Sequence, residues 1–310
     1  MKVSVVIPTY RREERLCDCL EDALQQERPL CDIIVVDQSP DHRPETIRFL
    51  RQVASRIRLI RLARPSVTAA CNAGARLATG DLLLFLDDDI RIPDRQLFSR
   101  HAGCYEDASV GIVAGRVRDA RGGAEQAFDP RSSDRVWGWY YTTWDHAKRA
   151  DVVTAPGANM SCRRALHARL GGFDERFTGN AVRFENDFCL RALQTGCRVI
   201  FEPSAEVVHH YDSEGGHDNR HLYGRTDESH AWYASYFQNM LYMTVKHMPV
   251  HTWPLVCWKL WRQHVCNRPF MGQGLRFLYE RHRTFIRGLR EGLKVGNDVV
   301  VRADSGRRAA

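Results

Sequence analysis

Apolar residues along the first 120 positions follow two alternating patterns. Short, unbroken apolar runs are typical of parallel strands that are buried on both faces. Such runs occur at Val3–Ile7, Ile33–Val36, Ile57–Leu62 and Leu82–Leu86. Between them, from Glu13 to Gln26 and from Thr68 to Ala78, apolar residues recur at helical spacing. Alternating strands and helices predict βαβ units and hence an α/β fold with a mostly parallel, Rossmann-like sheet flanked by helices.

The pattern becomes less regular after residue 110 and changes character after residue 225. We expect strands at Val110–Val117, Asp151–Ala155 and Arg198–Phe201, and helices at Arg163–Leu170 and Glu185–Thr195. From about residue 226, long helical stretches rich in aromatic and basic residues run to about Val295. The chain is therefore expected to form one domain over 1–225 and a C-terminal helical extension over 226–310, with a frayed tail from about residue 302.

Composition narrows the class of protein. The 310 residues are 44% hydrophobic and 27% charged, as expected of a folded globular chain, with a net charge of +7. That excess is compatible with an anionic ligand or a membrane surface. The ten cysteines include no C-x-x-C pair, which argues against a zinc knuckle. The N-terminal apolar run is too short for a signal peptide, and no apolar stretch could span a bilayer, so we expect a cytoplasmic protein.

Polar residues follow several of the predicted strands directly. Pro8, Thr9 and Tyr10 follow the first, Asp37 the second, and the triplet Asp87–Asp89 the fourth. Parallel sheets bind ligands beyond the carboxyl ends of their strands, so these residues should meet at one edge. Three consecutive carboxylates repel one another unless a cation lies among them, and Mg²⁺ or Mn²⁺ suits such hard oxygen ligands. The alternative is an acidic loop that caps the following helix.

Several motifs together resemble the family 2 glycosyltransferases of the GT-A fold over about residues 1–212. The motifs are Val3–Tyr10, Ile33–Ser39, Asn72-Ala73-Gly74, Ala78–Asp81, Leu86–Asp89, Gly171–Phe177 and Phe184–Arg191, in the family's order and spacing. The resemblance implies a metal-dependent, inverting hexosyl- or deoxyhexosyltransferase. Such an enzyme moves a sugar from a UDP- or dTDP-type donor to a hydroxyl of a glycan, polysaccharide or lipid-linked acceptor, as in cell-envelope polysaccharide synthesis.

The resemblance also assigns roles on the donor side. It places Pro8, Thr9 and Tyr10 along the nucleotide pocket, and Asp37 as the acceptor of a hydrogen bond from the base. Asp87 and Asp89 match the ends of the family's D-x-D motif, with Asp88 at its variable middle position. Asp89 would bind Mg²⁺ or Mn²⁺, Asp87 would contact the ribose or donor sugar, and His209 would join the metal or the diphosphate.

On the acceptor side, the resemblance makes Glu185 the general base that takes the proton of the attacking hydroxyl. Asp187 is the rival base, although a role in supporting the helix start or contacting the acceptor fits it better. Asn159 falls on the family's acceptor-side strand. Trp137 and Trp139 could stack on a sugar ring or belong to the core.

Three other readings stay open at this stage. A nucleotidyltransferase would use a similar sheet and acidic metal ligands, but the loop after the first strand has no glycine to hold a triphosphate. A nucleic-acid-binding module is disfavoured, because the bases are dispersed and the acidic triplet repels phosphates. A non-catalytic nucleotide- or sugar-binding protein is the third. Finally, the aromatic and basic C-terminal helices predict either an ordinary helical subdomain or peripheral binding to the inner face of the cytoplasmic membrane.

Overall fold

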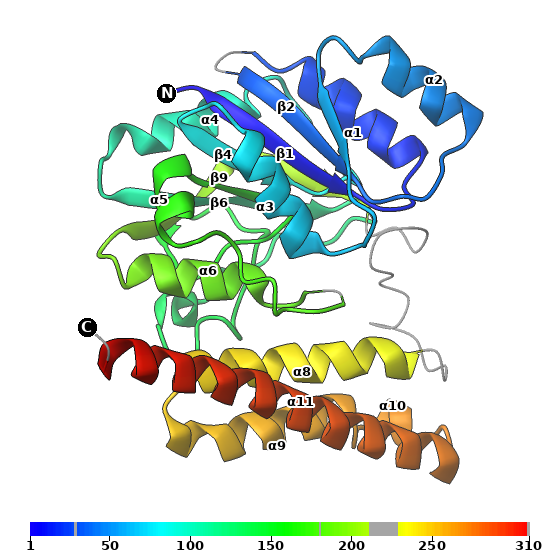
Figure 1. Ribbon diagram of the computed structural model, residues 1–310, viewed down its shortest axis with the longest axis vertical. Helices are drawn as coiled ribbons and strands as arrows, with labels where there is room; N and C mark the ends of the chain where they lie inside the picture. Colours follow the sequence, from blue (N-terminus) through cyan, green and yellow to red (C-terminus); the bar gives the residue numbers. More distant parts are fainter. Residues whose placement is uncertain (28–29, 180, 211–228, 309–310) are drawn as a thin grey trace. The chain divides into compact units, whose positions relative to one another are not determined.

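The computed structural model describes residues 1–27, 30–179, 181–210 and 229–308 of the chain (Figure 1). Contacts divide the chain into two compact units. The N-terminal unit comprises Met1–Asp174 and Glu185–His217, and the C-terminal unit comprises Glu175–Phe184 and Asp218–Ala310. The domain boundary that we expected near residue 225 lies outside the described residues. Each unit is described by itself below.

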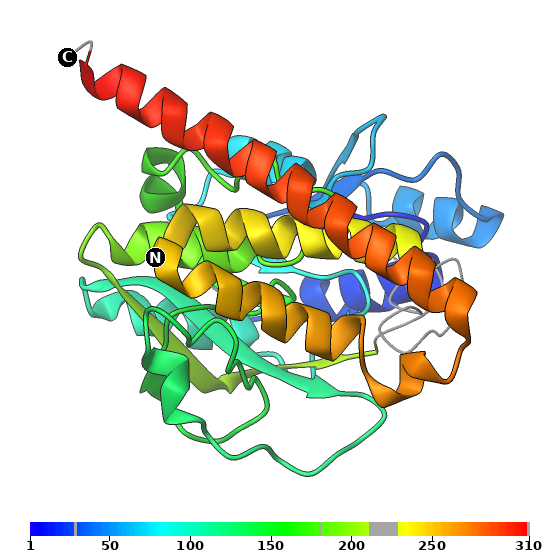
Figure 2. The ribbon, with the colours of Figure 1, turned by 90° about the horizontal axis from the view of Figure 1, so that it is seen from below.

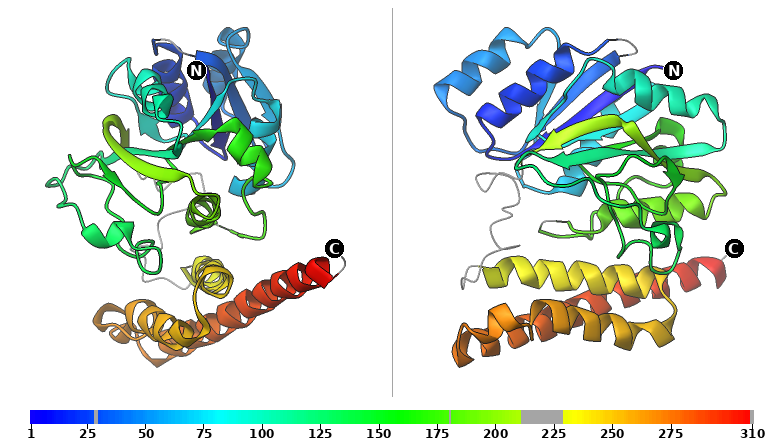
Figure 3. Two further views of the ribbon diagram at one scale, coloured as in Figure 1. Left: turned by 90° about the vertical axis from the view of Figure 1, so that its left-hand side faces the viewer. Right: turned by 180° about the vertical axis from the view of Figure 1, so that it is seen from behind.

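The described part of the N-terminal unit contains one nine-stranded sheet with helices on both faces (Figures 1 and 3). Its strands are β1 (Val3–Thr9), β2 (Leu30–Asp37), β3 (Arg58–Arg61), β4 (Leu82–Leu86), β5 (Ile90–Arg91), β6 (Val110–Asp119), β7 (Ala150–Asp151), β8 (Asn159–Arg163) and β9 (Arg198–His209). Its helices are α1 (Glu14–Leu24), α2 (Pro44–Gln52), α3 (Val67–Leu77), α4 (Leu97–Gly103), α5 (Arg164–Arg169) and α6 (Phe184–Leu193). These bounds confirm the strands and helices expected over the first 120 residues.

The strand order is β3-β2-β1-β4-β8-β6-β9-β5, and β7 pairs with β9. The four N-terminal strands β1 to β4 are parallel, as the apolar runs predict. β8 is antiparallel to both of its neighbours, β4 and β6. Through β8, strands β6 and β9 join the same sheet as β4. His209, at the end of β9, can therefore lie near the end of β4.

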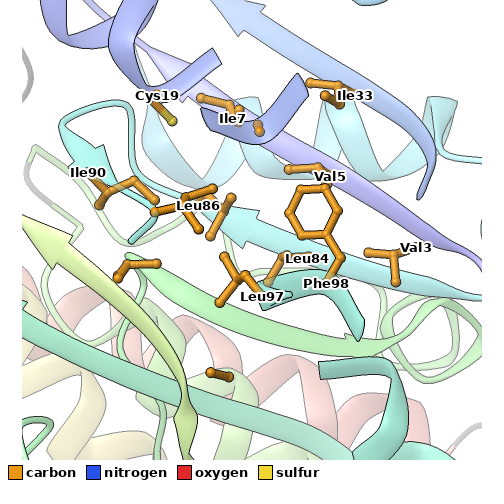
Figure 4. Close-up of a cluster of buried hydrophobic side chains, with 14 of the residues drawn as sticks. Val3, Val5, Ile7, Cys19, Ile33, Leu84, Leu86, Ile90, Leu97 and Phe98 are labelled. Atoms are coloured by element: carbon orange, nitrogen blue, oxygen red, sulfur yellow. The ribbon is translucent and has the colours of Figure 1, made fainter. Parts of the chain in front are cut away.

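The core of this unit lies between the sheet and helices α1 and α4. Val5 from β1, Leu84 and Leu86 from β4, and Phe98 from α4 have at most 2% exposed surface and pack against one another (Figure 4). Such burial stabilises the fold by about 1.5–3 kcal/mol for each large apolar side chain. The central strands are therefore a rigid base for the polar residues at their carboxyl ends.

One expected strand is mostly wrong. Of the segment expected to be a strand, Asp151–Ala155, only Asp151 lies in one, at the end of β7 (Ala150–Asp151). The chain leaves β9 after Val152, whose N–H bonds to Val199 O, and Val153 N–H instead bonds to Ser132 O. Pro156, which follows, has no N–H with which to continue a ladder.

The C-terminal unit is helical in its described part. It contains α8 (Ser229–His247), α9 (Trp253–His264), α10 (Arg268–Met271) and α11 (Leu275–Arg308). Figures 2 and 3 show α11 running along α8, with α9 beside both. Helix α11 continues through the tail that we expected to fray from residue 302, and residues 297–305 contain no proline to stop it. None of the described helices has both the length and the apolarity needed to cross a membrane.

Helices α8 and α11 approach closely because three glycines line their contact. A Cβ atom added at Gly288, Gly292 or Gly296 would lie within 2.5–2.6 Å of an atom of α8. At Gly292 that atom is the backbone oxygen of Gln238, which cannot move aside without shifting the helix. The two backbones can therefore lie nearly in contact only because these positions have no side chain.

Residues 175–184 belong to this unit through contacts with α8. The side-chain amide of Asn239 accepts a hydrogen bond from Thr178 N–H (3.1 Å) and donates one to Thr178 O (2.9 Å). Asn239 has no exposed surface, and the ring of Phe177 lies 5.1 Å from that of Tyr242. The short segment that precedes α6 in the chain is thus fastened to α8.

Candidate active site

The polar residues that follow the central strands do meet at one edge of the sheet. Thr9 at the end of β1 pairs in register with Asp37 at the end of β2. β4, which ends just before Asp87, is the other neighbour of β1. Ile90 of β5 pairs with His209 at the end of β9, and His210 N–H donates to Asp89 O at 3.0 Å. Backbone pairing therefore fixes His209 beside the acidic triplet.

Asp87, Asp89 and His209 form a cluster whose candidate ligand atoms all lie within 4.8 Å of one another. His209 Nε2 lies 3.2 Å from Asp87 Oδ2 and 3.4 Å from Asp89 Oδ1. Burial lowers the pKa of His209, but the hydrogen bond to Asp87 and the charge of Asp89 outweigh burial and raise it overall. Two carboxylates and one imidazole make a donor set that suits Mn²⁺ or Mg²⁺. The residues therefore fit the expected metal.

Sequence reasoning missed the cation in this cluster, Arg12. Its guanidinium Nη2 donates to Asp89 Oδ2 at 3.1 Å, and its Nε lies 3.5 Å from Asp88 Oδ1. Arg11 adopts the left-handed conformation (φ 54°), which turns the chain after β1 and begins the loop to α1. No sequence pattern links Arg12 to residues 76 and 77 positions away, although its place after Thr9-Tyr10 at a strand end was a usable signal.

The electrostatics of the cluster favour a further cation. Burial and the neighbouring charge of Asp89 raise the pKa of Asp88 to about 7, although Arg12 acts in the opposite direction. Asp88 and Asp89 are both buried. Arg12 thus faces both Asp88 and Asp89, whose negative charge lies where water cannot solvate it well.

Asp37 is held by a second polar network that the sequence did not reveal. Its Oδ1 accepts from Ser39 N–H at 2.8 Å, and its Oδ2 lies 3.1 Å from His42 Nε2 and 3.4 Å from Arg61 Nε. The other ring nitrogen of His42 lies 3.2 Å from Glu13 Oε1. The Asp37 side chain has no exposed surface, so any bond to a nucleotide base would add to contacts already present.

Glu185 lies in the first turn of α6, and the next two residues anchor that helix. Asn186 Nδ2 donates to Thr154 Oγ1. Asp187 has no exposed surface, and its Oδ2 accepts from Arg191 Nε at 2.8 Å. Arg191 also donates to the carbonyl oxygens of Leu170 and Gly172. Asp187 is therefore a buried partner of Arg191 within the fold, whereas Glu185 is only half-buried.

The loop at Gly171 and Gly172, which Arg191 of α6 contacts, is also hydrogen-bonded to α3. Asn72 Oδ1 accepts from Phe173 N–H at 2.8 Å, and Asn72 Nδ2 donates to Phe173 O at 2.9 Å. Gly172 has φ +78°, and a Cβ there would lie 2.5 Å from Asn72 Oδ1. Only glycine fits this turn, which explains the paired glycines of the motif.

The thiol of Cys71, on α3, is influenced by the charges of both Asp87 and Glu185. Burial is the largest cause of the raised pKa of its thiol, and the charges of Asp87 and Glu185 both raise it further. Cys71 has 3% exposed surface. The charges of both carboxylates therefore act on one buried sulfur atom.

The remaining predicted acceptor-side residues differ in accessibility. Asn159 has no exposed surface. Its Oδ1 accepts a hydrogen bond from His101 Nε2 at 2.9 Å, and its Nδ2 donates to Arg116 O and Ala205 O. Trp139 is also fully buried, with its indole N–H bonded to Val136 O. Trp137 is half-buried, so its ring is the more accessible of the two tryptophans.

The sequence profile described as Glycosyl transferase family 2 matches residues 4–171, more than half of the chain. The chain belongs to this family. Relatives that are similar in sequence include the O-antigen biosynthesis protein RfbC of Myxococcus xanthus, 27% identical over 67% of this chain and 17% of RfbC. Another is the probable glycosyltransferase YdaM of Bacillus subtilis, 22% identical over 66% of this chain and 49% of YdaM. The chain thus spans less than half the length of either relative.

Solved structures of similar fold cover nearly the whole glycosyltransferase chain. The mannosyltransferase PcManGT of Pyrobaculum calidifontis, in complex with GDP-Man and Mn²⁺, aligns over 98% of this chain and 79% of its own, with a TM-score of 0.55 and 19% identity. TarS residues 1–349 of S. aureus align over 94% and 89%, with a TM-score of 0.54 and 17% identity. The expected GT-A fold is thereby confirmed.

Proposed function

We propose that this chain is a metal-dependent, inverting glycosyltransferase that uses a nucleoside diphosphosugar. The observation that carries the proposal is the Asp87–Asp89–His209 cluster at the carboxyl edge of a sheet that belongs to this family. A similarly folded mannosyltransferase was solved with GDP-Man and Mn²⁺, which supports both the donor class and the metal. We retain a UDP- or dTDP-type donor, in which Asp37 would accept a hydrogen bond from the pyrimidine N–H.

Asp89 and His209 would bind Mn²⁺ or Mg²⁺, and Asp87 would contact the ribose or donor sugar. Such an ion neutralises the charge that develops on a departing diphosphate. Pro8, Thr9 and Tyr10 would line the nucleotide site. Arg12 holds Asp89 at 3.1 Å and so orients one metal ligand from within the protein.

Glu185 would take the proton of the acceptor hydroxyl as its oxygen attacks the anomeric carbon. Two observations support this role. Glu185 is half-buried, whereas Asp187 is committed to Arg191. Ala181 and Arg183 just before it adopt left-handed backbone conformations (φ 50° and 79°), and such strain in residues other than glycine is concentrated at functional sites.

We further propose that the acceptor is a glycan or a lipid-linked glycan of the cell envelope, reached at the inner membrane surface. The name of the relative RfbC, an O-antigen biosynthesis protein, supports such an acceptor.

The test of the donor and metal is thermal stabilisation by a panel of nucleotide sugars with Mn²⁺. A donor at about 100 times its Kd stabilises the folded protein by about 2.7 kcal/mol, which is about 5–10 °C for a unit of this size. The shift should require Mn²⁺ and should vanish in Asp89→Ala. It should persist in the control Asp81→Asn, whose carboxylate accepts a hydrogen bond from Lys2 N–H at the other end of β4. Stabilisation by nucleoside triphosphates alone, with pyrophosphate as product, would favour a nucleotidyltransferase instead.

A further inference from the structure

The two parts of the chain carry opposite net charge. Residues 229–310 contain thirteen Lys and Arg against four Asp and Glu, a net charge of +9. Because the whole chain carries +7, residues 1–228 sum to −2. The basic character of the protein therefore belongs entirely to the C-terminal helices, away from the acidic metal cluster in sequence.

Exposed apolar side chains are concentrated in the same helices. Among the described side chains, ten large hydrophobic ones are exposed, and seven of these lie between Val250 and Ile286. Isolated exposed apolar residues need no explanation, but a local excess of them marks an interaction surface.

On α9, the exposed apolar and basic residues share one face. Leu255, Trp258 and Arg262 follow one another at intervals of three and four residues, so they form one stripe. The Trp258 side chain is 52% exposed, and the Arg262 guanidinium lies 5.4 Å from its ring centre. The helix contacts its neighbours through other residues: His264 binds Tyr236 of α8, and Trp261 binds His282 of α11.

On α11, a second stripe has the same character. Tyr279, Arg283, Ile286 and Arg290 follow at intervals of four, three and four residues, and all are exposed. They lie on the side of α11 opposite Gly288, which contacts α8. Leu275, at the start of the helix, is 87% exposed.

We propose that these two stripes together form a surface that binds the headgroup region of an anionic lipid bilayer, and we call them the α9–α11 surface. This inference deepens the proposed function, because it names where the enzyme would meet a lipid-linked acceptor. Tryptophan, tyrosine and aliphatic side chains alternating with arginine suit an interface with an apolar interior and anionic headgroups. The +9 charge opposes docking of a second copy of the chain. A nucleic-acid backbone would satisfy the arginines but not cover Leu275 or Ile286.

The test is flotation of the full chain with vesicles of phosphatidylcholine alone or with roughly 30 mol% phosphatidylglycerol, at low and moderate salt. We expect binding only to the anionic vesicles and weaker binding as salt rises. The double variant Arg283→Gln/Arg290→Gln, which removes both arginines of the α11 stripe, should bind about 30-fold more weakly, because each basic residue near an anionic surface contributes a factor of about five. The variant Trp258→Gln should also bind more weakly.

The matched control is Arg48→Gln/Arg51→Gln, which removes two exposed arginines from α2 of the N-terminal unit and should bind as the unchanged chain does. Melting temperatures of all variants separate loss of fold from loss of binding. Absence of flotation, equal binding to neutral vesicles, or equal loss in the α2 control would overturn the proposal. Two further results would overturn the proposal. One is a concentration-dependent dimer that the α11 variant abolishes, and the other is binding to a DNA duplex, without binding to vesicles, that the same variant abolishes. Donor-dependent stabilisation needs no lipid, so it reports on the glycosyltransferase proposal independently.

Discussion

Exchanging the carboxylates of Glu185 and Asp187 for amides, one at a time, tests which of them is the base. If Glu185 takes the acceptor proton, Glu185→Gln should lower turnover by about 10²–10⁴-fold, the usual contribution of a general base. That loss corresponds to about 3–5 kcal/mol in the activation free energy. The fold should hardly change, because Glu185 is half-buried and its charge at the first turn of α6 contributes no more than about 1 kcal/mol.

Asp187→Asn should instead lower the stability of the fold and leave turnover of the folded protein nearly unchanged. Asp187 has no exposed surface, and its Oδ2 lies 2.8 Å from Arg191 Nε. Removing one partner of a buried ion pair costs about 3–5 kcal/mol. We expect the lower end, because Arg191 keeps its bonds to Leu170 O and Gly172 O. A loss of about 3 kcal/mol lowers the melting temperature by about 6–12 °C in a unit of this size.

The assay is release of nucleoside diphosphate from the donor identified by the panel, with water as acceptor, at a temperature where all variants are folded. Donor binding, followed by thermal shift, should be retained in Glu185→Gln, because only proton transfer is lost. If folded Asp187→Asn loses more than about 100-fold in rate while Glu185→Gln stays near normal, the assignment of the base is refuted.

Three further predictions concern the metal, the pH dependence of stability and the helical unit. Stabilisation by Mn²⁺ with UDP should be absent in Asp89→Ala and be reversed by EDTA in the unchanged chain; a shift that survives EDTA in scanning fluorimetry would exclude a metal role. Burial lowers the pKa of His101 to about 4 from 6.5. Because the folded-state value is the lower one, its contribution to stability is complete above pH 6.5 and is lost as pH falls toward 4. About 2 kcal/mol of this is lost by pH 5, so urea unfolding of His101→Gln should depend less on pH between 7 and 5. Gly292→Ala should destabilise the chain, although alanine favours a helix over glycine by about 1 kcal/mol. The control Gly103→Ala in α4 should not destabilise it, because no atom lies within 4 Å of the added Cβ. If both substitutions raised the melting temperature, α8 and α11 could separate at no cost.

The parts of the fold that follow from local pattern could be predicted from the sequence. Unbroken apolar runs such as Leu82–Leu86 located the central strands, because a strand covered on both faces has no polar positions. Since parallel strands all end at one edge, the sequence also predicted that Thr9, Asp37 and Asp87 would lie near one another. These predictions depend on neighbours along the chain or on a rule of sheet topology.

Contacts between distant positions could not be predicted in this way. The ion pairs of Arg12 with Asp88 and Asp89 depend on a left-handed turn at Arg11, and the contact of His42 with Glu13 depends on where α2 begins. The antiparallel insertion of β8 between β4 and β6 is likewise set by tertiary pairing, since its polar Asn159 and Ser161 disguise a buried strand. Whether a polar residue faces a ligand or completes the core, as Asn159 does, is decided by its partners and not by its type.

The attachment of residues 175–184 to α8 has a practical consequence for shortened versions of this protein. Cutting the chain near residue 226 would remove Asn239 and Tyr242, the partners of Thr178 and Phe177. The freed peptide would be the one that leads directly into Glu185. A truncated enzyme that is inactive would then say nothing about lipids or acceptors, and engineering of this chain should keep the helical region whole and alter only its outer side chains.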